Sequence, residues 1–155
     1  MSARTAAAYD ASMGRAANRV EIDAPIATVW AQITNVEDWP LWAPQMKRLE
    51  HLDPGALHLG SRVRVRPKGL PANVWRVTEF EDGRLFTWES SLVPGLRLSG
   101  GHELTAKGAG TSTEFWLDAG GPLGVLVGPI LRRTVFRRNT RNATEGLKSY
   151  IAARP

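Results

Sequence analysis

The histidines are the side chains of this sequence whose chemistry is easiest to use near neutral pH: His51, His58 and His102. An unperturbed imidazole titrates near neutrality and can transfer protons. By strand alternation His102 shares an apolar face with Leu98 and Leu104. His102 is therefore the best candidate for a catalytic acid or base, and it could also orient a ligand carbonyl or hydroxyl. A hydrogen-bonded core histidine explains the same pattern, so both interpretations stay open.

Other catalytic and cofactor patterns are absent from the sequence. The histidines lack metal-ligand spacing and the chain has no cysteine, so we expect no metal site. We also expect no cofactor, because no nucleophile elbow, P-loop or dinucleotide-binding glycine motif occurs. The longest apolar stretch, residues 119–131, is shorter than the ~20 residues of a membrane span. No secretory signal is evident, and the lack of cysteine fits a reducing compartment, so we expect a cytoplasmic protein.

The tryptophans are numerous, with six in 155 residues. Trp30 is expected in the core, and Trp116 has the opposite parity to its neighbour Phe115, which places it on the outer face of a sheet. An indole combines a broad apolar surface with one hydrogen-bond donor. The other four tryptophans either line a pocket or simply fill the concave side of a sheet: Trp39, Trp42, Trp75 and Trp88.

A run of arginines accounts for the net charge of +5. Such a patch on a helix could contact phosphates or an anionic surface. A solvated helix face also explains it and is the simpler interpretation, because the dipole favours cations in the C-terminal half of a helix. No aromatic residues interleave the arginines and no nucleic-acid motif accompanies them, so no specific nucleic acid is expected. The five residues are Arg132, Arg133, Arg137, Arg138 and Arg141.

The chain is expected to form one domain over residues 18–155, preceded by a flexible arm at 1–17. Alternation predicts a strand over Asn18–Asp23, and a helix is expected to begin near Ala24-Pro25. A second short helix is predicted over Asn35–Trp39, ended by the following proline. Turn residues separate six further strands: Met46–Leu52, Arg62–Arg66, Asn73–Phe80, Leu85–Leu92, Leu96–Thr105 and Thr111–Asp118. Their short links indicate antiparallel hairpins and an α+β fold.

The stretch Gly121–Pro155 predicts a long C-terminal helix. In its second half, apolar residues such as Ala143 and Leu147 fall opposite charged residues such as Arg141 and Lys148, as in an amphipathic helix. The first half is apolar nearly all round. We therefore expect it to be covered by the rest of the protein, or to cover a cavity or a partner.

Several short motifs follow one another between residues 18 and 153: Ile22-Asp23-Ala24-Pro25, Val29-Trp30, Trp39-Pro40-Leu41-Trp42-Ala43-Pro44, Gly101-His102-Glu103-Leu104-Thr105, Gly110-Thr111 with Thr113-Glu114-Phe115, and Gly121-Pro122-Leu123-Gly124. Their order and spacing resemble the START-like, or SRPBCC, superfamily, in its polyketide cyclase/dehydratase branch. The resemblance implies a helix-grip fold, in which a curved antiparallel sheet wraps the C-terminal helix and leaves an apolar cavity between them.

Side chains that face this implied cavity are the candidate ligand-binding residues. Strand alternation selects the apolar faces of the predicted strands, and the C-terminal helix supplies the opposite wall. The candidates are Trp42, Trp75, Phe86, Trp88, Leu98, His102, Phe115, Val127 and Leu131.

Three functions follow from these observations. The first is binding of a small hydrophobic ligand, whether aromatic, polyketide-like or lipid-like. The second is a cyclase or dehydratase in which His102 acts as acid or base; it rests on the resemblance alone. The third is an interaction module that contacts an anionic surface through the arginine run. The oligomeric state stays open.

Overall fold

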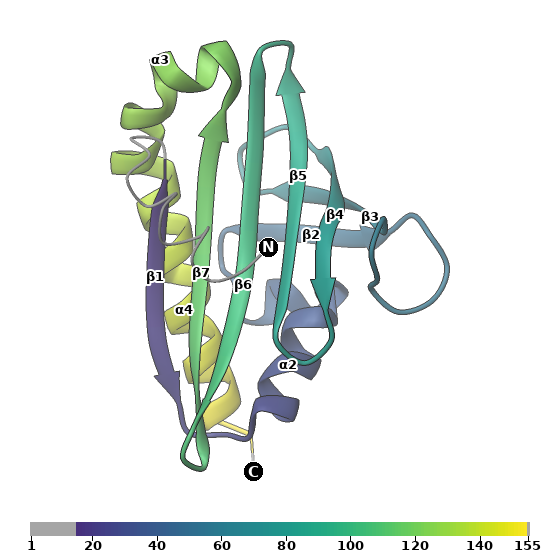
Figure 1. Ribbon diagram of the computed structural model, residues 1–155, viewed down its shortest axis with the longest axis vertical. Coiled ribbons are helices and arrows are strands. Elements are labelled where there is room, and N and C mark those ends of the chain that lie inside the picture. Colours follow the sequence, from purple (N-terminus) through teal and green to yellow (C-terminus); the bar gives the residue numbers. More distant parts are fainter. Residues whose placement is uncertain (1–14, 155) are drawn as a thin grey trace.

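The computed structural model describes residues 15–154 and contains a seven-stranded antiparallel sheet in the order β1-β7-β6-β5-β4-β3-β2. The first and last strands of the chain are neighbours, with Val20 opposite Thr113. Figure 1 shows the sheet curving across the long C-terminal helix. The strands are β1 (Ala16–Ile22), β2 (Met46–His51), β3 (Arg62–Pro67), β4 (Asn73–Glu81), β5 (Leu85–Val93), β6 (Leu96–Lys107) and β7 (Gly110–Gly120).

The helices occupy the two places that the sequence predicts. Between β1 and β2 lie the α-helix α2 (Ile26–Thr34) and a 3₁₀ turn, η1 (Val36–Leu41). After β7 the chain forms α3 (Gly121–Leu131), a π-helical turn η2 (Arg132–Phe136) and α4 (Arg137–Ala152). The predicted α+β arrangement of a curved sheet around a long C-terminal helix is confirmed.

Local sequence explains how the sheet and α4 bury one common side. Val63 and Val65 alternate with exposed or half-buried arginines on β3, so both valines point into the core. On α4, Ala143 and Leu147 are one turn apart and buried, as the amphipathic pattern predicts. The main core cluster joins α2, η1, the sheet and α4, and a smaller one consists of Ala16, Ala119 and Phe136.

The C-terminal helix departs from the prediction in two ways. The backbone N–H of Arg137 donates to the carbonyl of Arg132, five residues back, which makes one π-helical turn in an otherwise α-helical segment. The expectation that the apolar first half is covered is wrong, because Val125 and Leu126 are each 73% exposed and Ile130 is 64% exposed. The buried residues of α3 are Gly124 and Gly128, and among its larger side chains only Leu131 packs on a core cluster.

Smaller differences concern where elements begin and end. β1 begins at Ala16, so the end of the expected arm at 1–17 is part of the sheet; residues 1–14 lie outside the described residues. Pro40 does not end η1, which continues to Leu41, because a 3₁₀ turn this short tolerates the missing N–H. Within residues 15–154, no helix combines the length and apolar character needed to cross a bilayer.

Candidate ligand cavity

An apolar cavity of about 130 Å³ lies between the sheet and the C-terminal helix. The sheet supplies Val65, Pro67, Asn73, Trp75, Trp88, Leu98, Phe115 and Leu117, and the helix supplies Val135, Phe136 and Asn139. Trp39 of η1, Gln45 and Met46 at the start of β2, and Leu70 and Pro71 of the loop before β4 complete it. Carbon atoms therefore form almost the whole wall.

Three tryptophans make the inner wall rigid. The ring of Trp88 lies 5.2 Å from the ring of Trp39 and 5.4 Å from that of Trp75, centroid to centroid. The indole N–H of Trp39 donates to the carbonyl of Ile33 over 2.9 Å, which fixes that ring to the end of α2. Gly100 stands opposite Trp88 in the sheet, and a Cβ there would lie only 3.3 Å from its indole nitrogen. The missing side chain therefore makes room for the ring.

The outer end of the cavity reaches the protein surface between two segments. On one side lies the loop between β3 and β4, where Leu70 is 54% exposed. On the other side lies the π-helical turn, where Val135 is 38% exposed and Phe136 is buried. Both side chains of this turn line the cavity.

Besides the indoles, the lining contains three side-chain amides, those of Gln45, Asn73 and Asn139. Asn73 donates its Nδ2 to the hydroxyl of Ser90 over 2.8 Å, and is thereby fixed. Gln45 donates its Nε2 to the carbonyl of Asn139 over 3.3 Å, bridging the link before β2 to α4. The other amide atom of this residue, Oε1, is buried and has no hydrogen-bond partner within residues 15–154. A buried acceptor without a donor is costly, and this one belongs to a residue of the lining, so a ligand hydroxyl or N–H that reaches it would be bound favourably.

His102 lies behind the cavity wall and does not line it. It is fully buried, with ring centroids 5.1 Å from both Trp39 and Phe86 and 4.3 Å from Phe115. Burial lowers the pKa of His102 from 6.5 to about 3, because the charged imidazolium would lose its hydration. The imidazole is therefore neutral at physiological pH, and its Nε2 has no hydrogen-bond partner among the described residues.

The candidate residues from the sequence fall into three groups. Trp75, Trp88, Leu98 and Phe115 line the cavity. Trp42, Phe86 and His102 form a second layer behind it, where Trp42 packs on Trp39 at 5.3 Å. Val127 and Leu131 lie on α3, away from the lining. Whether any of them binds a ligand stays a prediction.

Several lining residues carry no signal that sequence reasoning could use. Gln45 and Asn139 are single amides in polar surroundings, and only their contact through the folded chain joins them. Leu70 lies in a turn-rich loop that alternation does not cover. Trp39 is the exception, because it is among the four tryptophans predicted either to line a pocket or to fill the concave side of the sheet. It lies at the inner wall of the cavity.

No described residues form a cluster of three or more histidine, aspartate or glutamate side chains that could hold a metal ion. The lining itself contains no titratable side chain. The arrangement can therefore bind by shape, apolar contact and one hydrogen bond, while proton transfer would need a group from the ligand or from solvent.

The family model described as "Polyketide cyclase / dehydrase and lipid transport" matches residues 13–152. This match spans nearly the whole chain, including every strand of the sheet and all three parts of the C-terminal helix. No curated protein sequence matches that of the chain.

Solved structures show the same fold at low identity. The Zhui aromatase/cyclase from Streptomyces sp. R1128 has a TM-score of 0.71 at 18% identity, over 90% of this chain and 94% of that one. A START superfamily protein from Mycobacterium smegmatis has a TM-score of 0.67 at 18% identity, over 88% of this chain and 98% of that one. The di-domain ARO/CYC BexL has a TM-score of 0.70 at 19% identity over 91% of this chain, which spans only 48% of BexL. These likenesses establish the helix-grip, START-like fold.

Proposed function

Because the chain belongs to the polyketide cyclase / dehydrase and lipid transport family, we propose that it binds a small hydrophobic ligand between its sheet and C-terminal helix. The observation that carries the proposal is the apolar cavity with one buried, unpartnered acceptor, Gln45 Oε1. Aromatic walls supply most of the binding free energy of such sites, and a few polar groups set the orientation of the ligand.

The size of the cavity narrows the class of ligand. Its volume of about 130 Å³ is close to the ~150 Å³ of a dry apolar cavity known to hold benzene. It is smaller than the ~300–1,000 Å³ typical of pockets for drug-sized molecules. We infer that this conformation takes one aromatic ring that carries a hydroxyl or N–H group. A polyketide-like or lipid-like molecule would need the loop bearing Leu70 to separate from the π-helical turn.

A cyclase or dehydratase is the alternative. Its support is the family description and the names of similar structures such as the Zhui aromatase/cyclase. Against it stands the absence of titratable groups among the residues that line the cavity. His102 is separated from the cavity by its own aromatic neighbours, and we propose that it is a core residue rather than an acid or base. Binding without chemistry therefore remains the first proposal.

We further propose a cytoplasmic protein without a specific nucleic-acid partner. The lack of cysteine supports the location, and the lack of aromatic residues among the arginines of residues 132–141 argues against single-strand recognition. The oligomeric state is left open.

A pair of probes that differ in one hydroxyl tests the proposal. Toluene and p-cresol would be titrated into the protein while the indole N–H signals of Trp39, Trp75 and Trp88 are followed by NMR. We expect both probes to shift these signals, and p-cresol to bind about tenfold more tightly, because a hydrogen bond to a buried acceptor contributes ~1–1.5 kcal/mol.

The variant Gln45→Met keeps the length of the side chain and removes the acceptor. It should abolish the preference for p-cresol and leave toluene binding unchanged. Gln32→Met is the matched control, because Oε1 of Gln32 is also buried and unpartnered but lies outside the cavity lining. If neither probe shifts the indole signals, the cavity does not bind aromatic ligands and the proposal fails.

A further inference from the structure

The helix α3 buries glycines and exposes several large apolar side chains, the reverse of an ordinary surface helix. Its buried residues are Gly124 and Gly128, whereas Val125, Leu126 and Ile130 are 64–73% exposed. A surface helix normally buries its large apolar side chains and exposes polar ones. On α3 the exposed side carries no polar side chain at all, since the segment reads Gly-Pro-Leu-Gly-Val-Leu-Val-Gly-Pro-Ile-Leu.

Close backbone packing fixes this orientation. A Cβ on Gly124 would lie 2.9 Å from the carbonyl carbon of Ala119, so α3 rests directly on the end of β7. The backbone N–H of Leu123 also donates to the carbonyl of Gly95 over 2.9 Å, in the turn between β5 and β6. Rotating the helix to bury Leu126 would place large side chains where only glycine fits. The outward position of its apolar residues is therefore built into the fold.

The neighbouring hairpin enlarges this apolar surface. Val93, at the end of β5, is 45% exposed, and Gly95, two residues further on, accepts the backbone N–H of Leu123. Figure 1 shows α3 and the β5–β6 turn together at one end of the molecule. We call this surface the apolar tip; it consists of Val93, Leu123, Val125, Leu126 and Ile130.

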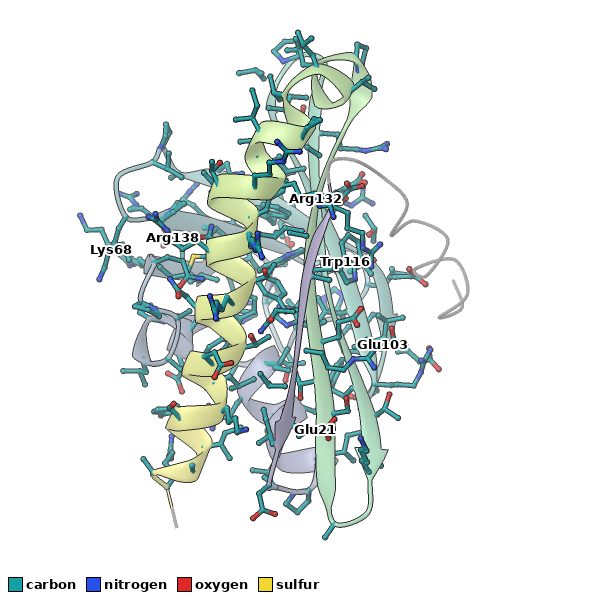
Figure 2. The ribbon with its side chains drawn as sticks, turned by 90° about the vertical axis from the view of Figure 1, so that its left-hand side faces the viewer. Glu21, Lys68, Glu103, Trp116, Arg132 and Arg138 are labelled. Atoms are coloured by element: carbon teal, nitrogen blue, oxygen red, sulfur yellow. The ribbon has the colours of Figure 1, made fainter. Side chains whose placement is uncertain are left out.

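Positive charge begins where the apolar tip ends. Residues 119–144 contain five arginines and no acidic residue. All five arginines are exposed, and none forms an ion pair with another residue of the described chain. Figure 2 shows Arg132 near the top of the helix, below α3, and Arg138 at the same edge of the molecule as Lys68. Cations thus follow the tip along the helix toward the outer end of the cavity.

From this juxtaposition we infer that the apolar tip docks on an anionic lipid bilayer. Exposed aliphatic side chains followed at once by unpaired arginines are what an interfacial segment needs: the former enter the boundary of the acyl chains and the latter bind headgroup phosphates. A second copy of this chain fits the surface less well, because it would bring two sets of unpaired arginines together. The inference does not depend on any ligand in the cavity.

Docking would also place the outer end of the cavity beside the membrane. Val135 lies between Arg133 and Arg137 in the chain and lines the cavity. Headgroups bound to these two arginines would lie next to that opening. An apolar molecule could then pass between bilayer and cavity without crossing much water.

Vesicle co-sedimentation tests the inference with the full chain. The vesicles would consist either of equal parts phosphatidylcholine and phosphatidylglycerol or of phosphatidylcholine alone. We expect the protein to sediment with the anionic vesicles, and to be released from them at high salt, because the headgroup contacts of the arginines are screened. Binding to neutral vesicles should be at least about tenfold weaker, since each basic residue near an anionic surface contributes about fivefold.

Two double variants separate the parts of the surface. Leu126→Ser with Ile130→Ser should reduce binding to anionic vesicles at least about tenfold, because burial of each aliphatic side chain is lost. Arg132→Gln with Arg133→Gln should reduce it about twenty-fivefold. The matched controls are Leu41→Ser with Leu59→Ser, both more than 60% exposed elsewhere, and Arg76→Gln with Lys148→Gln, two exposed cations outside the run of five arginines. Both controls should bind like the unchanged protein.

Three results would overturn the inference. The protein could fail to bind anionic vesicles, it could bind neutral ones equally well, or the controls could lose as much binding as the test variants. A concentration-dependent dimer that Leu126→Ser with Ile130→Ser abolishes would assign the tip to a second copy instead. Circular dichroism of each variant verifies that the substitutions, all at exposed positions, leave the fold intact.

Discussion

The imidazole of His102 stacks on the ring of Phe115, with 4.3 Å between the centroids and 15° between the planes. The two residues are direct cross-strand partners on β6 and β7. Phe86 faces His102 from the other side, as its partner on β5. A histidine held between two aromatic rings, with no exposed surface and no charged neighbour to stabilise its proton, behaves as a flat, neutral core side chain.

This environment predicts how stability depends on pH. Above pH 6.5 the imidazole is neutral in both the folded and the unfolded chain, so it adds no pH dependence. Between pH 6.5 and about 3 the unfolded chain binds a proton that the folded chain excludes. The free energy of unfolding therefore falls as the pH falls, by up to about 1.4 kcal/mol per pH unit.

The variant His102→Leu isolates this contribution. Carboxylates titrate in both proteins, so they cancel in the difference between the two unfolding free energies. Urea unfolding at several pH values should show that the unfolding free energy of the variant, relative to that of the unchanged protein, increases as the pH falls below 6.5. Equal pH dependence in both proteins would mean that folding does not lower the pKa of His102, and would return this residue to consideration as an acid or base.

The strands and their antiparallel hairpins could be predicted because each hairpin carries its own local signal, whereas the pairing of β1 with β7 joins the two ends of the sheet sequence and carries none. Arg62–Arg66 alternates strictly, and glycine-containing turns separate most of the later strands. The resemblance added the curvature of the sheet and the position of the long helix. The predicted strand ends differ from the observed ones by one or two residues, since the end of a strand depends on its neighbour in the sheet and not on its own residues.

The candidate site was only partly predictable, and α3 shows why. Its apolar residues suggested burial, yet Gly124 decides the orientation through its contact with Ala119, which sequence periodicity does not reveal. The alternation of β6 placed His102 on the inner face correctly but could not show that aromatic rings separate it from the cavity. Gln45 meets Asn139 only because α4 packs against the link before β2.

Gly146 lies where α4 packs directly against that link. A Cβ there would lie 1.8 Å from the carbonyl oxygen of Trp42. In an exposed helix, glycine to alanine stabilises by about 1 kcal/mol. Here we expect Gly146→Ala to lower the free energy of unfolding by about 2–3 kcal/mol, because the backbone must move apart. Ser149→Ala, exposed on the same helix, should be neutral or slightly stabilising. Denaturant unfolding of both variants measures this, and a stabilised Gly146→Ala would contradict the contact.

Trp88 should carry much of the stability of the cavity wall. It is 3% exposed and packs against Trp39, Trp75 and Phe86. Replacing it with alanine is expected to cost ~3–5 kcal/mol of unfolding free energy, the usual loss for a packed tryptophan. Trp116→Ala should cost less, because that ring lies on the outer face of the sheet beneath the guanidinium of Arg15. Thermal and urea unfolding compare the two, and equal losses would mean that the inner wall is loosely packed.

Filling the cavity should separate ligand binding from stability. Leu98 points from β6 into the cavity of about 130 Å³, so Leu98→Phe places its extra atoms in existing space. We expect the unfolding free energy to change by less than ~1.5 kcal/mol, while binding of toluene and p-cresol is lost. Val74→Phe adds the same ring at a position of β4 that is 41% exposed, and should leave binding intact. Titration of the tryptophan indole signals provides the measurement for both variants.

Unchanged binding to a folded Leu98→Phe protein would show that the probes occupy another site. Loss of binding in both variants would show that the effect is not specific to the cavity.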